Sequence, residues 1–131
     1  MADIADATTR VLAGEAGCAL AYDNAAALGV GGYTSGMGPL LGYWIEHGRL
    51  SASPAVEAVL RNHLAHNRDR MDKLAGTGRQ VVENLSKAGV TTTIFKGMHT
   101  AFVYFPEPGI RPSADNDIFI SQNEMPAADG V

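Results

Sequence analysis

Cysteine is almost absent from this chain: Cys18 is the only one, so no disulfide can form within it. Such scarcity is typical of proteins in a reducing compartment. No apolar run approaches the ~20 residues that a transmembrane helix requires. Residues 1–6 are acidic and lack the basic residues that open a secretion signal. We therefore expect a cytoplasmic location, and we assign no role to Cys18.

Basic residues are also in short supply. The sequence has 10 Lys and Arg against 14 Asp and Glu, a net charge of −4. This balance gives no electrostatic argument for a nucleic-acid partner, although it leaves room for a local basic patch. With 46% hydrophobic and 18% charged residues in 131, the composition indicates one globular domain, or a small domain with an appendage.

The first half of the chain reads as mainly helical. Residues 4–28 are rich in Ala and Leu and predict a helix, weakened by Gly14 and Gly17. Residues 29–38 contain too many glycines for a stable helix and lack the Gly-x-x-x-x-Gly-Lys-Ser/Thr pattern of a phosphate loop. We expect a flexible connector there. Residues 39–47 predict a short apolar helix.

A long helix is predicted over residues 54–88. Ser53 is a suitable N-cap and Pro54 suits the first helical position, while Gly89 suits the C-terminal end. Apolar residues recur at three- and four-residue spacing, with glycines at 76 and 78 as a weak point: either one helix or two nearly collinear ones. The repeating residues are Val56, Leu60, Leu64, Met71, Leu74, Val81, Val82 and Leu85.

Two histidines of this helix, His63 and His66, fall on one helical face, as a zinc pair would. No third ligand is placed near them in the sequence. Neighbouring Arg and Asn residues favour a solvated polar face instead.

The second half of the chain predicts strands around a short helix. Residues 90–95 are β-branched and aromatic, which favours a strand, and 98–105 predict a helix with Ala101, Phe102 and Phe105 on one side. After this helix, prolines at 106, 108 and 112 and Gly109 interrupt regular secondary structure. A second strand is expected at about 115–120. Residues 122–131 are expected to form a loose tail.

The chemistry concentrates in this half. In a strand, Asp115 and Asp117 project from the same face, and two unpaired carboxylates that close need a cation or a proton between them. Mg²⁺ suits such a pair when substrate phosphates complete its shell. Gly97, with Lys96 beside it, allows backbone to approach a phosphate. Together these features indicate metal-assisted phosphoryl or nucleotidyl transfer.

The same residues carry a resemblance. Ile94-Phe95-Lys96-Gly97 and the run Tyr104-Phe105-Pro106-Glu107-Pro108-Gly109-Ile110-Arg111-Pro112-Ser113-Ala114-Asp115-Asn116-Asp117-Ile118-Phe119-Ile120 resemble the signature of a bacterial family of uncharacterised nucleotidyltransferases, in the DNA polymerase beta-type superfamily. The resemblance implies an α+β fold, mainly helical at first and then a small, incomplete mixed sheet. It divides the chain into a helical region (1–88), a nucleotidyltransferase core fragment (89–121) and a tail (122–131).

The resemblance also implies roles. Asp115 and Asp117 match a pair that binds Mg²⁺ or Mn²⁺, and the reaction moves a nucleoside monophosphate from an NTP to an acceptor hydroxyl on a protein, a small molecule or an RNA end. The sequence does not distinguish these acceptors or the nucleotides. The residues expected at the phosphates are Lys96, Gly97, Met98, His99 and Arg111.

This chain departs from the family pattern in three places. Met98 replaces a frequent Ser, and Asn116 stands where an apolar residue is usual. The third carboxylate comes from a later strand in the superfamily, yet only Glu124 and Asp129 follow here, so the chain resembles the front half of the enzyme.

Three interpretations stay open. The chain is a nucleotidyltransferase; or it is a truncated, non-catalytic fragment that self-associates or receives a missing C-terminal half in trans; or the aspartates are a solvated turn pair. His99 is either a site residue or a polar residue at a helix start.

Overall fold

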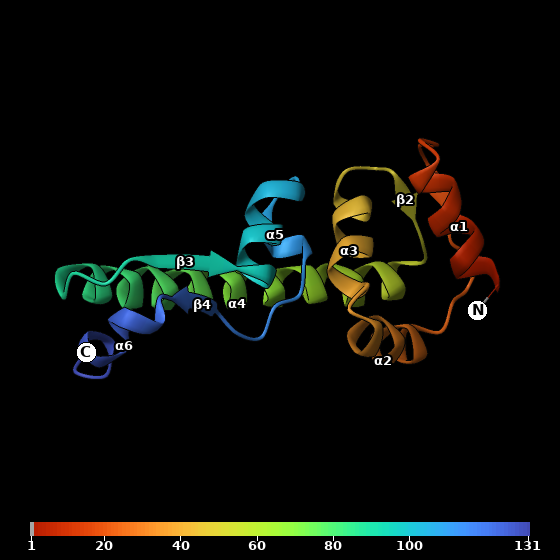
Figure 1. Cartoon of the computed structure of the whole chain (residues 1–131). Helices are drawn as coiled ribbons and strands as arrows, with labels where there is room; N and C mark the ends of the chain where they lie inside the picture. The colour runs from red at the N-terminus through yellow and green to blue at the C-terminus, as the bar shows by residue number, and fades with distance from the viewer. Residues whose placement is uncertain (1) are drawn as a thin grey trace. The chain divides into compact units, whose positions relative to one another are not determined.

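The computed structural model describes residues 2–131 as a mainly helical α+β fold with two small sheets, which confirms the predicted fold class (Figure 1). The chain forms two compact units, one ending at Asn67 and the other beginning at Arg68. The elements in order are α1 (Ala2–Leu12), β1 (Cys18–Ala19), α2 (Ala25–Ser35), α3 (Gly38–Glu46), β2 (Leu50–Ser51), α4 (Pro54–Lys87), β3 (Thr92–Phe95), α5 (Lys96–Tyr104), the 3₁₀ turn η1 (Pro108–Ile110), β4 (Asp117–Ile120), the 3₁₀ turn η2 (Gln122–Glu124) and α6 (Met125–Ala128).

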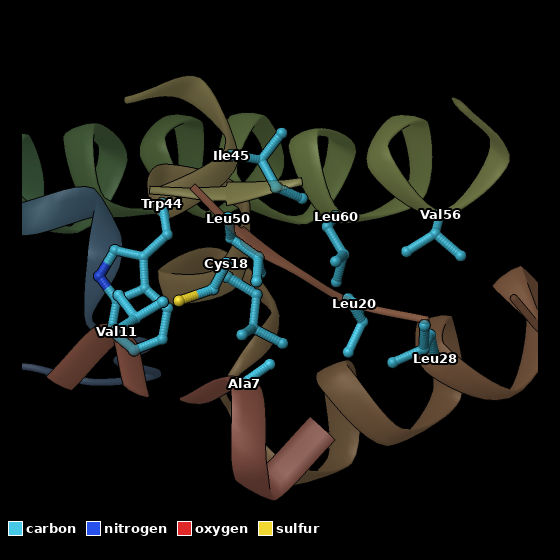
Figure 2. Packing of buried hydrophobic residues seen from close by; sticks show 11 residues of the cluster. Ala7, Val11, Cys18, Leu20, Leu28, Trp44, Ile45, Leu50, Val56 and Leu60 are labelled. Atoms are coloured by element: carbon cyan, nitrogen blue, oxygen red, sulfur yellow. The ribbon is translucent and has the colours of Figure 1, made fainter. Parts of the chain in front are cut away.

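The first unit has one hydrophobic core, in which side chains from several elements converge (Figure 2). The parallel pair β1–β2 places Cys18 opposite Leu50, and both are buried. Trp44 of α3 is also buried. The core residues are Ala7, Val11, Cys18, Leu20, Leu28, Leu41, Trp44, Ile45, Leu50, Val56 and Leu60.

The expectation of one helix over residues 4–28 was wrong. Helix α1 ends at Leu12, and Gly14 and Gly17 follow with φ values of +95° and +67°, a backbone region that favours glycine. The glycines therefore end the helix rather than weaken it.

The expectation of a flexible connector at residues 29–38 was also wrong, because most of this stretch belongs to α2 and α3. Asn24 caps α2 by accepting a hydrogen bond from the Ala27 N–H, and Gly36 ends it with φ +71°. A Cβ at Gly29 would lie 3.2 Å from Val59 of α4. A Cβ at Gly32 would lie 3.2 Å from the Cα atom of Gly38 in α3. The glycines thus allow α2 to approach its neighbours closely.

Helix α4 is continuous from Pro54 to Lys87, close to the predicted 54–88. The predicted apolar face is buried at Val56, Leu60, Leu64, Met71 and Leu85, whereas Val81 is exposed. The two compact units divide within this helix, at residue 67 rather than near its end. The proposed division of the chain at residue 88 stays a prediction.

His63 does not lie on a solvated face, contrary to expectation. Its Nδ1 atom is buried without a hydrogen-bond partner. It packs against Gly32 and Gly38, in space that a side chain at either position would fill. Burial lowers the pKa of His63, and the nearby charge of His66 lowers it further.

The second unit combines the C-terminal part of α4 with a hairpin and short helices, and Figure 1 shows β3 and β4 running beside this helix. Helix α5 begins at Lys96, two residues earlier than predicted; it buries Met98 and Ala101 but leaves Phe102 exposed. The C-terminal segment is not a structureless tail, because it folds into η2 and α6.

Candidate functional site

The antiparallel hairpin β3–β4 organises the second unit. Its register places Thr93 opposite Phe119 and Phe95 opposite Asp117. Side chains opposite each other share a face and alternate along each strand. Thr93, Phe95, Asp117 and Phe119 therefore line one face, which we call the outer face. The strand prediction at 90–95 and about 115–120 was confirmed for 92–95 and 117–120.

The opposite face of the hairpin is held against α4 by Asn116. Its Nδ2 atom donates a hydrogen bond to the Leu74 carbonyl at 2.9 Å, so this polar side chain has a partner at a position where an apolar residue was expected. A Cβ at Gly78 would meet Asn116 at 3.2 Å. A glycine in the helix thus makes room for the amide.

Because Asn116 faces α4, the alternation turns Asp117 away from the helix, onto the outer face. Asp117 is half-buried there. Asp115 lies before the first residue of β4 and is exposed. Residues 117–120 pair with 92–95 as a strand, so Asp117 does not lie in a turn, contrary to the third interpretation.

Lys96 connects the hairpin directly to α5. It has φ +46°, and it is the only non-glycine residue with a positive φ in the part of the chain that the structure describes. Its side chain is 68% exposed, and its Nζ atom lies 3.9 Å from Oδ1 of Asp117, whose side chain is 39% exposed. A lysine ammonium and one predicted metal-binding carboxylate therefore share the outer face.

Gly97 is buried where α5 meets the segment before β4. A Cβ there would lie 2.5 Å from Oγ of Ser113 and 3.2 Å from Nη1 of Arg111, so any larger residue would force these side chains to shift. Nη1 of Arg111 donates to the Gly97 carbonyl at 3.3 Å and to the Pro112 carbonyl at 3.4 Å. Arg111 is extended, as Pro112 predicts. These contacts fix the segment that leads to the aspartates.

The remaining expected site residues divide between interior and surface. Met98 is buried against Met71, where it packs in a small core with Ala101. His99 is exposed, and its ring meets the ring of Tyr104 edge-on at 6.1 Å. Sequence reasoning placed both near phosphates, yet the side chain of Met98 points into the core.

Sequence reasoning missed the contact that holds the Pro-Glu-Pro-Gly turn. Arg68 of α4 donates two hydrogen bonds to the carboxylate of Glu107, at 2.7 and 3.0 Å. A Cβ at Gly109 would lie 2.5 Å from Cγ of Arg68, and Ile110 is buried beside the turn. The signal in the sequence was Glu107 itself, an acidic residue between two prolines.

A third carboxylate is not brought to Asp117. Oε1 of Glu124 accepts a hydrogen bond from the Thr91 N–H at 3.0 Å, at the end of β3 remote from Phe95. Thr91 and Phe95 are separated by about 13 Å of extended chain. No three His, Cys, Asp or Glu side chains gather as a metal cluster anywhere in residues 2–131.

The donors present nevertheless fit a Mg²⁺ or Mn²⁺ ion bound together with a nucleotide. Such ions take one or two protein carboxylates and complete their shell with phosphate oxygens and water. Asp115 and Asp117 are both accessible to solvent, and their carboxylates offer oxygen ligands. A cationic group, the Lys96 ammonium, already lies beside Asp117.

The comparison with protein families identifies the family of the chain. The family model described as uncharacterised nucleotidyltransferase matches residues 34–131, and the chain belongs to that family. The match includes the hairpin, α5 and both aspartates. Neither a curated protein nor a solved structure matches the chain. Within residues 2–131, no helix has both the length and the apolar character that crossing a bilayer demands.

Proposed function

We propose that this chain binds an NTP with Mg²⁺ or Mn²⁺ on the outer face of the hairpin and transfers the nucleoside monophosphate to an acceptor hydroxyl. The acceptor oxygen forms a bond to the α-phosphorus, the bond to the pyrophosphate oxygen breaks, and pyrophosphate leaves while the hydroxyl proton passes to solvent or a base. The observation that carries the proposal is Asp117, turned outward by the Asn116 anchor and paired with Lys96.

Asp115 and Asp117 would hold the metal ion, which neutralises charge on the phosphates during the displacement. The residues of the chain orient the nucleotide. The first N–H groups of α5, at Gly97 and Met98, have no side-chain cap from Phe95 and are suited to an anionic phosphate. Lys96 supplies a mobile ammonium, and His99 is an exposed residue at the same helix end.

Arg111 is better suited to positioning than to direct phosphate binding. Its guanidinium already donates to the carbonyls of Gly97 and Pro112. By this contact it fixes the start of α5 relative to the segment that carries Asp115. A guanidinium offers five donors, so bonds to phosphate oxygens remain compatible with this role.

The test is calorimetric titration of each NTP with Mn²⁺ present, on the wild type and on Asp115→Asn/Asp117→Asn. We expect binding in the wild type and a loss of tenfold or more in the double variant, since ~1.4 kcal/mol of lost ion contacts changes affinity tenfold. Asp129→Asn is the matched control, because Asp129 lies in the turn after α6 and should not affect binding. Absence of binding by a folded wild type contradicts the proposal.

A second candidate is a non-catalytic or split protein whose hairpin associates with another copy or a separate subunit. The outer face supports it, because Phe95 is 55% exposed and Phe119 is 66% exposed. Each strand of the pair also has an open edge available for pairing. A partner strand could bring the carboxylate that Glu124 does not supply. Failure of nucleotide binding in the titration above would favour this candidate.

A further inference from the structure

The backbone of Lys96 is unusual for a residue with a side chain. The other residues with positive φ in the described chain are glycines, at 14, 17, 36, 48 and 89. Glycine adopts this region without steric cost, whereas a residue with a Cβ is strained there. Strained residues of this kind persist where the surrounding structure holds them, and they cluster at functional sites.

Burial of the Lys96 side chain does not offset this strain, because the side chain is 68% exposed. What the conformation provides is position. The chain passes from β3 into α5 without a linking residue, and the ammonium comes to lie 3.9 Å from Oδ1 of Asp117. A glycine at 96 would give the same turn but no charge.

We infer that Lys96 is an internal counter-cation. Its ammonium pairs with the Asp117 carboxylate in the metal-free protein, and it pairs with the triphosphate instead when metal and nucleotide bind together. This inference rests on the proposed function and assigns a regulatory task to one residue of that site. Two cations at one carboxylate repel each other, so Lys96 weakens binding of a metal ion alone. The anionic triphosphate gives the ammonium a new partner.

The consequence is coupled binding. The metal and the nucleotide each raise the affinity for the other by the same factor, as linkage requires. Lys96 contributes to that factor, because its charge opposes the metal alone and favours the nucleotide. The protein would therefore bind Mg²⁺ weakly in the absence of nucleotide and would bind it chiefly as the metal–nucleotide complex.

The test measures Mn²⁺ binding alone, by the paramagnetic resonance of the free ion, and NTP binding at saturating Mn²⁺, by calorimetry. For Lys96→Met we expect Mn²⁺ alone to bind about two- to fivefold more tightly, the range of an exposed ion pair. We expect the NTP to bind about tenfold more weakly. Lys73→Met, at an exposed position of α4, is the control and should change neither affinity.

Lys96→Gly separates strain from charge. It should show the same two shifts in affinity and, in addition, a higher melting temperature than Lys96→Met, because glycine relieves the left-handed conformation. Both affinities moving in one direction, or Mn²⁺ binding unchanged in Lys96→Met, overturns the counter-cation inference while the proposed function stands. If neither the wild type nor any variant binds Mn²⁺ or NTP, both fail.

Discussion

Gly97 packs against Ser113 where the start of α5 meets the segment that leads to the aspartates. A methyl group at 97 would lie 2.5 Å from the Ser113 hydroxyl oxygen but 3.7 Å from its Cβ, an ordinary contact distance. The glycine of the Lys-Gly motif is thus required by packing within the protein, apart from any phosphate. A substitution there should respond to the size of residue 113.

We predict that Gly97→Ala lowers the free energy of unfolding by about 1–3 kcal/mol, the cost of overpacking a well-packed contact. Ser113→Ala in the same protein should recover much of this loss, because it removes the atom that clashes. Urea denaturation of the two single variants and the double variant gives the coupling energy. Equal effects of Gly97→Ala in both backgrounds would show that the contact does not limit residue 97.

The residue roles could be predicted only in part from the sequence. The outward placement of Asp117 follows from the two-residue period of a strand. The partners of the motif could not be predicted: Arg68 is 39 residues from Glu107, and Asn116 is 42 residues from Leu74. Such pairs depend on which face of α4 the hairpin covers, and periodicity within one element does not contain that information.

At the scale of elements, Asn116, the residue before β4, connects the hairpin to α4 by a hydrogen bond from its amide, which lies where Gly78 has no side chain. Gly76 and Gly78 both lie in this helix, but a Cβ at Gly76 would have no neighbour within 4 Å, whereas one at Gly78 would meet Asn116. The two glycines therefore offer a matched comparison two residues apart.

We predict that Gly76→Ala stabilises the protein by up to ~1 kcal/mol through helix propensity. Gly78→Ala should gain less, or lose stability, because Asn116 must shift. In an Asn116→Ala background, which itself costs about 0.5–1.5 kcal/mol for the lost hydrogen bond, Gly78→Ala should stabilise as much as Gly76→Ala does. Thermal and urea denaturation measure these differences; identical gains at 76 and 78 in the wild type would contradict the packing described.

Among the elements, prediction succeeded where local pattern and tertiary packing agree. Helix α4 has a proline start and a regular apolar repeat, and β3 has β-branched residues. Prediction failed at α2, where intrinsic propensity argues against a helix with glycines at 29, 31 and 32. The glycines allow α2 to pack closely against α3 and α4, and this packing outweighs the low helix propensity of glycine. A single sequence does not show which helices pack against each other.

At the scale of the whole molecule, His63 makes stability depend on pH. Its pKa is lowered by burial in the folded state, so the unfolded state binds the proton more tightly. The contribution of His63 is therefore complete above the unfolded value of 6.5 and is lost as the pH falls below it.

We predict that the melting temperature falls as the pH is lowered from 7.5 to 5.5. His63→Phe should make this fall shallower, because it removes an imidazole that binds a proton more tightly in the unfolded state than in the folded state. His66→Gln should have a smaller effect in the same direction, since His66 is the lesser cause of the shift. Differential scanning calorimetry across this range is the measurement. An unchanged slope in His63→Phe would place the titration on other groups.

Cys18 gives the first unit a chemical reporter of its own motions. It is the only thiol of the chain, and its side chain is 1% exposed in the core beside Leu50. A thiol reagent reaches its sulfur only when this region opens, so the modification rate measures the frequency of that opening. The hairpin has no such group. A ligand bound at Asp117 would therefore slow the labelling of Cys18 only if the two units open together.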